Sequence, residues 1–216
     1  MPEFDSGKRI LWLLSIITIT INTGCKIYPN QKKVNLERSW AVYKADAEGT
    51  AYSILSEINT NNVQNLEIAW THKFSDAPAG SRGGNSESNP IIIDGVMFTL
   101  SARHRAYALD ATTGKQIWAF DPFNGESGGG IGRGVTYWEE GNDKRILLTA
   151  GDKLFALNAL TGIPIPSFGN NGWISMNVGM RGDPSKISVI PTSPGIVFRN
   201  LLIIGNEVSE LYGAEP

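Results

Sequence analysis

A short motif that returns after 48 residues is the strongest constraint on the fold of this 216-residue chain. Residues 108–118 read Ala-Leu-Asp-Ala-Thr-Thr-Gly-Lys-Gln-Ile-Trp, and residues 156–162 read Ala-Leu-Asn-Ala-Leu-Thr-Gly. In both copies strand residues lead into a turn, where Asp or Asn can cap backbone groups and Gly accepts a positive φ. A period in the forties, with short strands and glycine turns, is typical of β-propeller blades of four strands each. We therefore predict an all-β chain that supplies about three blades of a propeller.

Trp118 is the expected hydrophobic anchor of the repeat. Burying its side chain stabilises the fold by about 4–6 kcal/mol as an upper estimate. Counting back 48 residues from Trp118 leads to Trp70, which predicts an earlier, degenerate copy of the motif. Counting forward leads to Pro166, so the last copy lacks the tryptophan, and nearby Phe168 is a candidate to replace it.

The first complete blade is expected within residues 90–120. Asp94-Gly95 is a two-residue hairpin signal between two apolar runs. The run at 91–93 is continuously apolar, as expected for a strand covered on both faces. We expect its four strands at residues 91–93, 96–100, 105–109 and 115–120. Before this blade, Asn61-Asn62 can start a short helical turn, and residues 66–70 alternate as a half-buried strand does.

Two further blades are expected after residue 132. The second has predicted strands at residues 134–138, 145–150 and 153–157, with a polar turn at 139–144. Residues 163–190 are interpreted as an insertion. The third opens with strands at 196–198 and 201–204 around an Arg199-Asn200 turn. Because an open propeller leaves terminal strands unpaired, we expect the chain to be the N-terminal part of a longer protein.

Residues 1–25 are read as an export signal. Lys8-Arg9 precede an uncharged run at 10–21, too short for a membrane span of about 20 residues but right for a signal peptide. Cys25, the only cysteine, stands where a bacterial lipoprotein signal places its lipidated residue. A plain secretory signal, an uncleaved anchor and a buried strand remain alternatives. We therefore divide the chain into a signal at 1–25, a tether and domain edge at 26–50, and a partial propeller at 51–216.

Charge and glycine patterns exclude two classes of partner. The net charge of −2 and the lack of a like-charged block argue against nucleic-acid binding. The loop at 121–132 is rich in glycine, but no Gly-Lys-Ser/Thr follows it and no helix start is visible, so it is not a phosphate cradle. A flexible loop is the simpler interpretation, and a close backbone approach to a flat ligand remains open.

Seven ordered runs make residues 40–216 resemble the quinoproteins, the dehydrogenases that depend on pyrroloquinoline quinone (PQQ). The runs lie at residues 58–71, 87–91, 108–118, 133–138, 164–169, 192–194 and 205–210. The glucose-dehydrogenase-like branch is the most similar, with alcohol-oxidising members near it. The resemblance implies an eight-bladed propeller with PQQ and calcium on its axis. It also implies oxidation of a sugar or alcohol by hydride transfer to PQQ, with a quinone or cytochrome as electron acceptor.

The resemblance also assigns PQQ contacts to three side chains of this chain. Glu87 lies where the family has a carboxylate at the quinone's edge, Arg133 where an arginine sits beside the reactive carbonyl, and Thr192 where a threonine binds a PQQ carboxylate. Cations and hydroxyls are suitable partners for a tri-acid with polar carbonyls. The alternatives are a solvated loop carboxylate, a surface arginine and a turn cap.

Further assignments lie near the end of the chain. Val208 and Ser209 would approach PQQ through backbone atoms, and Glu210 would be a calcium ligand, an oxygen donor of the kind that calcium prefers. His72 and His104 match no catalytic position and are expected to be structural or exposed. The family's catalytic aspartate is expected beyond residue 216, so residues 1–216 alone are expected to be inactive.

Two other functions use the same blades. Outer-membrane assembly lipoproteins carry this repeat in a cofactor-free propeller scaffold, and they also begin with a lipidated cysteine. A truncated module that binds sugar or protein is the third possibility. Blade repeats alone do not separate these functions. Residues Glu87, Arg133 and Thr192 favour the enzyme. From the signal pattern we expect it to be exported to the periplasmic side of a bacterial membrane and anchored there through Cys25.

Overall fold

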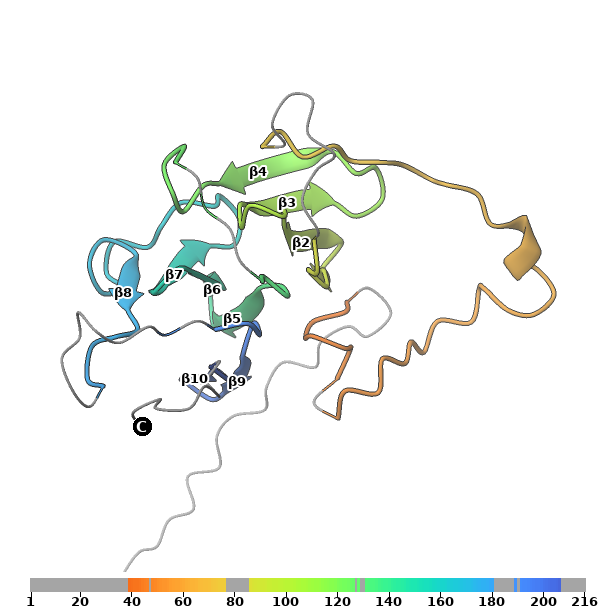
Figure 1. Ribbon diagram of the computed structural model, residues 1–216. Coiled ribbons are helices and arrows are strands. Elements are labelled where there is room, and N and C mark those ends of the chain that lie inside the picture. Colours follow the sequence, from red (N-terminus) through yellow and green to blue (C-terminus); the bar gives the residue numbers. More distant parts are fainter. Residues whose placement is uncertain are drawn as a thin grey trace, which may run out of the picture. The chain divides into compact units, whose positions relative to one another are not determined.

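The computed structural model describes residues 39–46, 48–76, 86–126, 128, 131–180, 189 and 191–206, and these form an all-β structure (Figure 1). The strands make two four-stranded antiparallel sheets and one two-stranded sheet, each built from consecutive strands. The predicted fold class of four-stranded blades is therefore confirmed. The signal at 1–25 with Cys25, and residues Val208, Ser209 and Glu210, lie outside the described residues.

The first sheet follows the predicted blade closely. It contains β1 (Ile91–Ile93), β2 (Val96–Leu100), β3 (Ala106–Asp110) and β4 (Gln116–Phe120), in that order. Asp94 and Gly95 both have positive φ, 50° and 84°, as a tight hairpin between twisted strands requires. In β1 the first and last isoleucines are buried and the central one is half-buried, so both faces are largely covered as expected.

The second sheet corrects two predictions. It contains β5 (Thr136–Glu140), β6 (Asp143–Ala150), β7 (Lys153–Asn158) and β8 (Trp173–Ser175). The polar turn predicted at 139–144 is only Gly141-Asn142, because the polar strand ends pair across it, Glu139 with Lys144. Residues 163–190 are more than an insertion, because they supply the fourth strand, β8. Trp173 pairs with Phe155 of β7, and the Nζ of Lys153 lies 4.5 Å from the centre of the Trp173 ring.

The third sheet is a hairpin of β9 (Ile196–Phe198) and β10 (Leu201–Ile203). The predicted Arg199-Asn200 turn is confirmed, and β10 ends one residue before the predicted boundary. The helical turn predicted at Asn61-Asn62 is confirmed as the 3-10 helix η1 (Val63–Asn65). None of the described helices is long and apolar enough to cross a membrane.

The strand predicted at residues 66–70 is wrong. These residues form no strand, and Leu66 and Ile68 are 59% and 83% exposed. Alternating sequence specifies a strand only where a neighbouring strand completes the hydrogen bonds, and no described strand lies beside this segment. Trp70, on the same face of the alternation, is the residue that packs.

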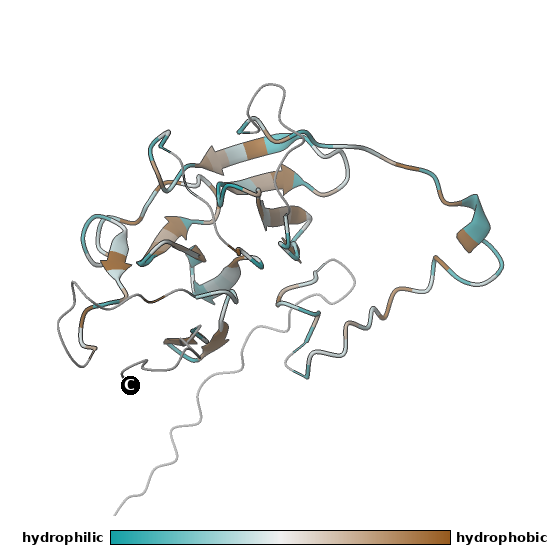
Figure 2. Ribbon diagram, viewed as in Figure 1, coloured by the Kyte–Doolittle hydropathy of each residue, from teal (hydrophilic) through white to brown (hydrophobic). Residues whose placement is uncertain are grey.

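The two four-stranded sheets share one hydrophobic core. Figure 2 shows apolar residues along the facing strands of both sheets. Phe120 of β4 and Phe155 of β7 meet edge to face with ring centroids 5.4 Å apart. The core includes residues from both sheets, among them Ile91, Phe98, Leu100, Ile146, Leu148 and Leu157. Burial of this shared surface is the main force that holds the two sheets together.

Trp118 joins the sheets as the repeat predicted. Its side chain is 7% exposed, and its indole Nε1 donates to the carbonyl of Ala159 at 3.0 Å. The ring lies flat against Gly162, where an added Cβ would stand 2.6 Å from ring carbons. Gly162 also has φ +71°, so the residue is required both by its backbone conformation and by the close approach.

Trp70 makes the same contacts one repeat earlier. Its Nε1 donates to the carbonyl of Ala111 at 3.1 Å, and an added Cβ on Gly114 would lie 2.4 Å from its ring. Trp70 is therefore the equivalent of Trp118, as the spacing predicted. In the last copy Pro166 is exposed, and Phe168 packs against the small core cluster of the second sheet itself.

We call residues 110–114 and 158–162 the docking turns. In the first, the carboxylate of Asp110 accepts the amides of Thr112 and Thr113 at 3.0 and 2.8 Å. In the second, the amide oxygen of Asn158 accepts the amides of Leu160 and Thr161 at 3.0 and 3.1 Å. The repeat is thus preserved in its hydrogen bonds as well as in its residues.

Candidate functional site

Three short segments precede the first strands of the three sheets, and we call them lead-in segments. They are residues 86–90 before β1, 131–135 before β5 and 191–195 before β9. Glu87 stands four residues before β1, Arg133 three before β5 and Thr192 four before β9. The three side chains predicted to bind PQQ therefore occupy corresponding places in successive sheets.

The structure brings these three residues together around the guanidinium of Arg133. Its Nη2 lies 3.4 Å from the Oε2 of Glu87, which is an ion pair. Its Nη1 donates to the carbonyl oxygen of Thr192 at 3.1 Å. Residues 46 and 59 positions away in sequence thus converge on one cation. For Thr192 the contact uses the backbone carbonyl, whereas the resemblance assigned a role to the side chain.

The cluster remains open to solvent. The side chains of Arg133 and Glu87 are 35% and 49% exposed. Such an ion pair contributes about 0–1 kcal/mol, because water and salt screen it. It therefore orients the guanidinium without saturating it. Arginine has five N–H donors in a planar fork, so donors remain for a carboxylate or carbonyl of a ligand.

A backbone contact aligns the first two lead-in segments. The amide of Asn89 donates to the carbonyl of Arg133 at 2.9 Å. Gly134 has φ +144°, and an added Cβ would lie 2.8 Å from the carbonyl oxygen of Asn89. A glycine is therefore needed next to Arg133 so that the two segments can approach.

Two hydroxyl groups extend this alignment, and the sequence analysis did not single them out. The Oγ of Ser88 accepts the amide of Leu100 at 3.1 Å and lies 3.1 Å from the hydroxyl of Thr99, which fixes the Glu87 segment to β2. The Oγ1 of Thr136 donates to the carbonyl of Pro194 at 2.6 Å, which fixes the third segment to β5. Serine and threonine are too common in strands for sequence to mark these two.

Part of the glycine-rich loop is packed. The carboxylate of Asp121 accepts the amides of Phe123 and Gly125 and pairs with Arg105 at 2.7 Å. Burial works to raise the pKa of Asp121, but these donors and the Arg105 charge outweigh it and hold the pKa below its usual value. An added Cβ on Gly128 would stand 2.0 Å from the Phe123 ring. These contacts order the Asp121 turn, and the flexible-loop interpretation of the segment stays a prediction.

Both histidines occupy packed positions. The Nδ1 of His72 lies 3.1 Å from the carbonyl oxygen of Gly114, and its ring meets Phe74 and Tyr107 edge to face. His104 is 6% exposed, beside Gly132. These surroundings support the structural role expected for them.

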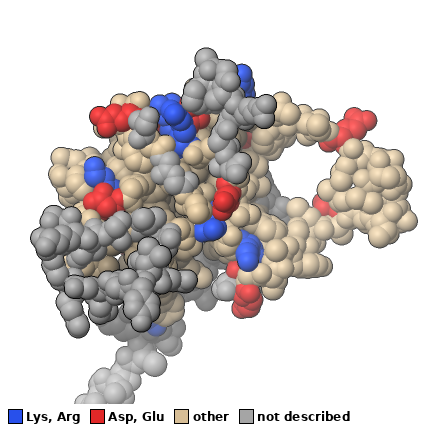
Figure 3. Space-filling model, viewed as in Figure 1, with Lys and Arg blue, Asp and Glu red and all other residues tan. Residues whose placement is uncertain are grey.

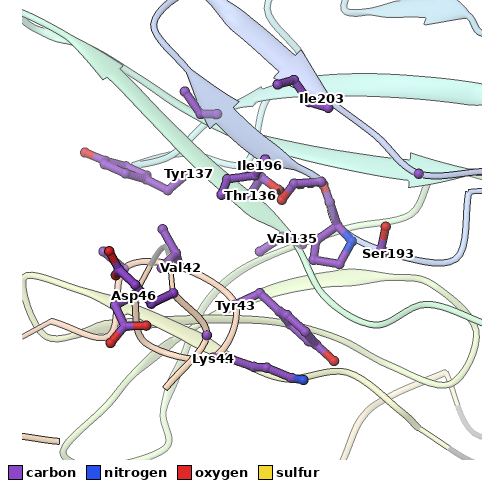
Figure 4. A pocket seen from close by; sticks show the side chains of 17 residues that line it. Val42, Tyr43, Lys44, Asp46, Val135, Thr136, Tyr137, Ser193, Ile196 and Ile203 are labelled. Atoms are coloured by element: carbon purple, nitrogen blue, oxygen red, sulfur yellow. Dashed lines mark hydrogen bonds between the residues drawn. The ribbon is translucent and has the colours of Figure 1, made fainter. Parts of the chain in front are cut away.

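A cavity of about 510 Å³ in the described part of the chain was not foreseen. It lies between residues 41–49 and the strands β5 and β9 (Figure 4). Tyr43, Lys44 and Asp46 line one side, and Thr136 and Ser193 line the other. Ser193, the neighbour of Thr192, thus lines the cavity, but Glu87, Arg133 and Thr192 do not.

The visible face of the described residues carries charges of both signs, and Figure 3 shows the acidic and basic side chains interspersed there. Among the described residues, no group of three or more His, Cys, Asp and Glu side chains is placed to hold a metal ion. The predicted calcium ligand, Glu210, lies outside those residues, so its role stays a prediction.

The family model described as "Glucose/ethanol/alcohol dehydrogenase, beta-propeller domain", which carries the label PQQ, matches residues 40–215. The chain is 30% identical over 201 residues to quinoprotein glucose dehydrogenase A of Acinetobacter calcoaceticus, covering 82% of this chain and 25% of that protein. It is 31% identical over 181 residues to the quinohemoprotein alcohol dehydrogenase of Comamonas testosteroni, covering 81% and 22%.

Solved structures give the same result. The crystal structure of the Comamonas testosteroni quinohemoprotein alcohol dehydrogenase matches with a TM-score of 0.60 and 27% identity, covering 81% of this chain and 24% of that one. A quinohemoprotein alcohol dehydrogenase from Pseudomonas putida matches with a TM-score of 0.62 and 28% identity, covering 79% and 23%. The chain therefore spans about a quarter of the length of the relatives that it matches.

Proposed function

The chain belongs to the PQQ-dependent glucose/ethanol/alcohol dehydrogenase family of β-propellers, and we propose that it is the N-terminal part of such an enzyme. The reaction that we propose is oxidation of a sugar or alcohol hydroxyl, with the electrons passed to a quinone or cytochrome. Relatives named glucose and alcohol dehydrogenases are 30% and 31% identical to this chain, so the proposal covers both substrate classes.

The convergence of Glu87, Arg133 and Thr192 is the observation that carries this proposal. The donor set fits PQQ, because a guanidinium with free N–H groups can bind carboxylates and quinone carbonyls. When bound, PQQ supplies the quinone that accepts hydride from the substrate carbon. A cofactor-free scaffold has no need for an arginine held by two neighbouring sheets and left open to solvent.

The residues of this chain have binding and orienting roles in the proposal. Arg133 binds and orients an anionic or carbonyl edge of the cofactor, and Glu87 holds the guanidinium in place and can accept a hydrogen bond. Thr192 fixes the opposite side of Arg133 through its carbonyl. No catalytic base is assigned to this chain, and we propose that the proton of the substrate hydroxyl goes to a carboxylate of a later blade.

The proposal also includes calcium, export and a lipid anchor. Glu210 is the proposed calcium ligand, Val208 and Ser209 are proposed backbone contacts to PQQ, and Cys25 is the proposed lipidation site. With these parts, the proposal puts the enzyme on the periplasmic side of a bacterial membrane. They rest on the sequence resemblance and the signal pattern alone. The comparison of PQQ binding between variants tests the site without them.

The test compares two charge-removing variants of the protein expressed from its own gene, with any downstream reading frame included. Arg133→Ala should weaken PQQ binding at least tenfold, because a charge-assisted hydrogen-bond donor is lost. Lys115→Ala is the control, since Lys115 is an exposed cation beside the first docking turn and outside the three lead-in segments. Binding is followed by titration of the quinone absorbance, and turnover by dye reduction with glucose and ethanol. Equal PQQ affinity in both variants would overturn the site assignment.

Residues 1–216 alone test whether the proton acceptor lies outside this part of the enzyme. Purified with PQQ, calcium and a dye acceptor, they should show no sustained oxidation of glucose. Sustained turnover by these residues would mean that the proton acceptor lies within them, contrary to the proposal.

A further inference from the structure

We propose that Thr136 is a positioning residue for the candidate cofactor site, because its buried hydroxyl holds the third lead-in segment against β5. The inference rests on the proposed function for its importance to PQQ, but its structural part can be tested separately. The hydroxyl of Thr136 bonds the carbonyl of Pro194 and none of the side chains of Glu87, Arg133 and Thr192, so its proposed role is indirect.

The geometry around Thr136 is that of a buried clamp. The residue is 7% exposed, and its Oγ1 donates to the carbonyl of Pro194 at 2.6 Å. The carbonyl of Gly195 lies 3.3 Å from the same oxygen. Pro194 is itself buried, so the hydroxyl satisfies an acceptor that water reaches poorly. Figure 4 shows Thr136 on β5 facing the segment that carries Ser193.

The clamp matters because the third segment has few other attachments to the second. The first two segments share the backbone bond between Asn89 and Arg133. Within the described residues, no backbone–backbone hydrogen bond joins residues 131–140 to residues 191–198. The described hydrogen bonds between them come from side chains, those of Thr136 and Arg133.

This arrangement makes the two side-chain bonds interdependent. Arg133 reaches the carbonyl of Thr192, two residues before Pro194. If the Thr136 bond is lost, Arg133 makes the remaining described hydrogen bond to the lead-in segment itself, and the same guanidinium is the group proposed to bind the cofactor. Because Thr136 holds the third lead-in segment, the remaining N–H donors of Arg133 can bind the cofactor.

The first experiment measures hydrogen–deuterium exchange in the protein without cofactor. Thr136→Val keeps the shape and removes the donor, so the hydrogen-bonded amides of the adjoining β9–β10 ladder should exchange on the order of tenfold faster. Thr136→Ser keeps the hydroxyl and should restore slow exchange. Thr112→Val is the control, because it removes an exposed hydroxyl in the first docking turn. Unchanged exchange in Thr136→Val, or equally fast exchange in Thr136→Ser, overturns the proposed clamp.

A second pair keeps the test valid if Thr136→Val does not fold. Thr136→Ala and Thr136→Ser differ only in the hydroxyl group, so faster exchange of the β9–β10 ladder in the alanine variant alone supports the clamp. Equal exchange in the two variants overturns it.

The second experiment separates positioning from stability. With the protein from its own gene, PQQ titration of Thr136→Val should show on the order of tenfold weaker binding, and Thr136→Ser should bind as the wild type does. Wild-type affinity in Thr136→Val, despite faster exchange, means that the clamp is only structural and overturns the positioning role. If the wild type itself binds no PQQ, the proposed function fails, while the exchange experiment still decides the clamp.

Discussion

The junction between the first and second sheets differs in kind from the junction between the second and third. At the first junction Trp118 is buried against Gly162, and the two sheets share one large core. At the second junction Trp138 is half-buried, and its Nε1 donates to the carbonyl of Arg199 at 3.3 Å. Within the part of the chain that the structure describes, the buried members of the cluster there are Leu147, Leu154 and Ala156. Hydrophobic burial secures the first junction, and side-chain hydrogen bonds have the larger share in the second.

Stability and site geometry depend on different junctions. Arg133 belongs to both junctions, because it pairs with Glu87 of the first sheet and bonds Thr192 before the third. The first junction sets the position of the Arg133 backbone. The second, weaker junction sets the position of the third lead-in segment relative to Arg133. Variants at the first junction should therefore affect mainly stability, and variants at the second mainly the site.

Trp118→Ala should have the largest effect on stability. Removing a buried tryptophan leaves a cavity in the shared core and should cost about 3–5 kcal/mol. Trp138→Ala is the matched variant at the second junction, and its half-exposed ring should cost about 1–2 kcal/mol. Urea denaturation gives both free energies of unfolding. Equal losses would show that the two junctions do not differ as described.

Gly162→Ala should have the next largest effect, because it combines two penalties. A φ of +71° costs a residue with a Cβ about 1–2 kcal/mol. The Cβ would also lie 2.6 Å from the Trp118 ring, and such overpacking adds about 1–3 kcal/mol. Gly141→Ala is the control, since Gly141 has φ +60° and no neighbour within 4 Å of the added Cβ. If the two variants unfold at the same urea concentration, the contact with Trp118 does not contribute as proposed.

The sequence predicted the first junction because its determinants are local and repeated. Asp110 and Asn158 form the same capped turn, and the spacing alone identified Trp70 as the equivalent of Trp118. The strand β8 was missed because only three residues, Trp173–Ser175, form it, and they gain their structure by pairing with β7. The strand predicted at 66–70 failed for the converse reason, since its pattern was correct but no described strand pairs with it.

The candidate site was predictable only in part. The resemblance named Glu87, Arg133 and Thr192, but their convergence on one guanidinium depends on how three sheets pack, which no local pattern encodes. Ser88 and Thr136 were not predicted, because a buried threonine that donates to a distant carbonyl has the same sequence appearance as any strand threonine. Such contacts between distant segments become visible only in three dimensions.

The smallest predicted effect is a difference in the pH dependence of stability between the two docking turns. One carries the charged Asp110 and the other the neutral Asn158. Hydrogen bonds from the hydroxyl and amide of Thr113 hold the pKa of Asp110 below its usual value, whereas Asn158 does not titrate in this range. Because the pKa is lower in the folded than in the unfolded state, the ionised turn stabilises fully above the unfolded value of about 3.9. That contribution is lost as the pH falls through the folded pKa.

Thermal unfolding of the wild type and Asp110→Asn between pH 5 and pH 2.5 measures this contribution. Asp121 and Asp143 also have lowered pKa values, so both proteins lose stability on acidification. The wild type should lose slightly more, and the difference between the two curves belongs to Asp110. Asn158→Asp should add the same pH dependence to the second turn, because the two turns have the same hydrogen bonds. Parallel curves for all three proteins would mean that the turns depend on an oxygen acceptor and not on its charge.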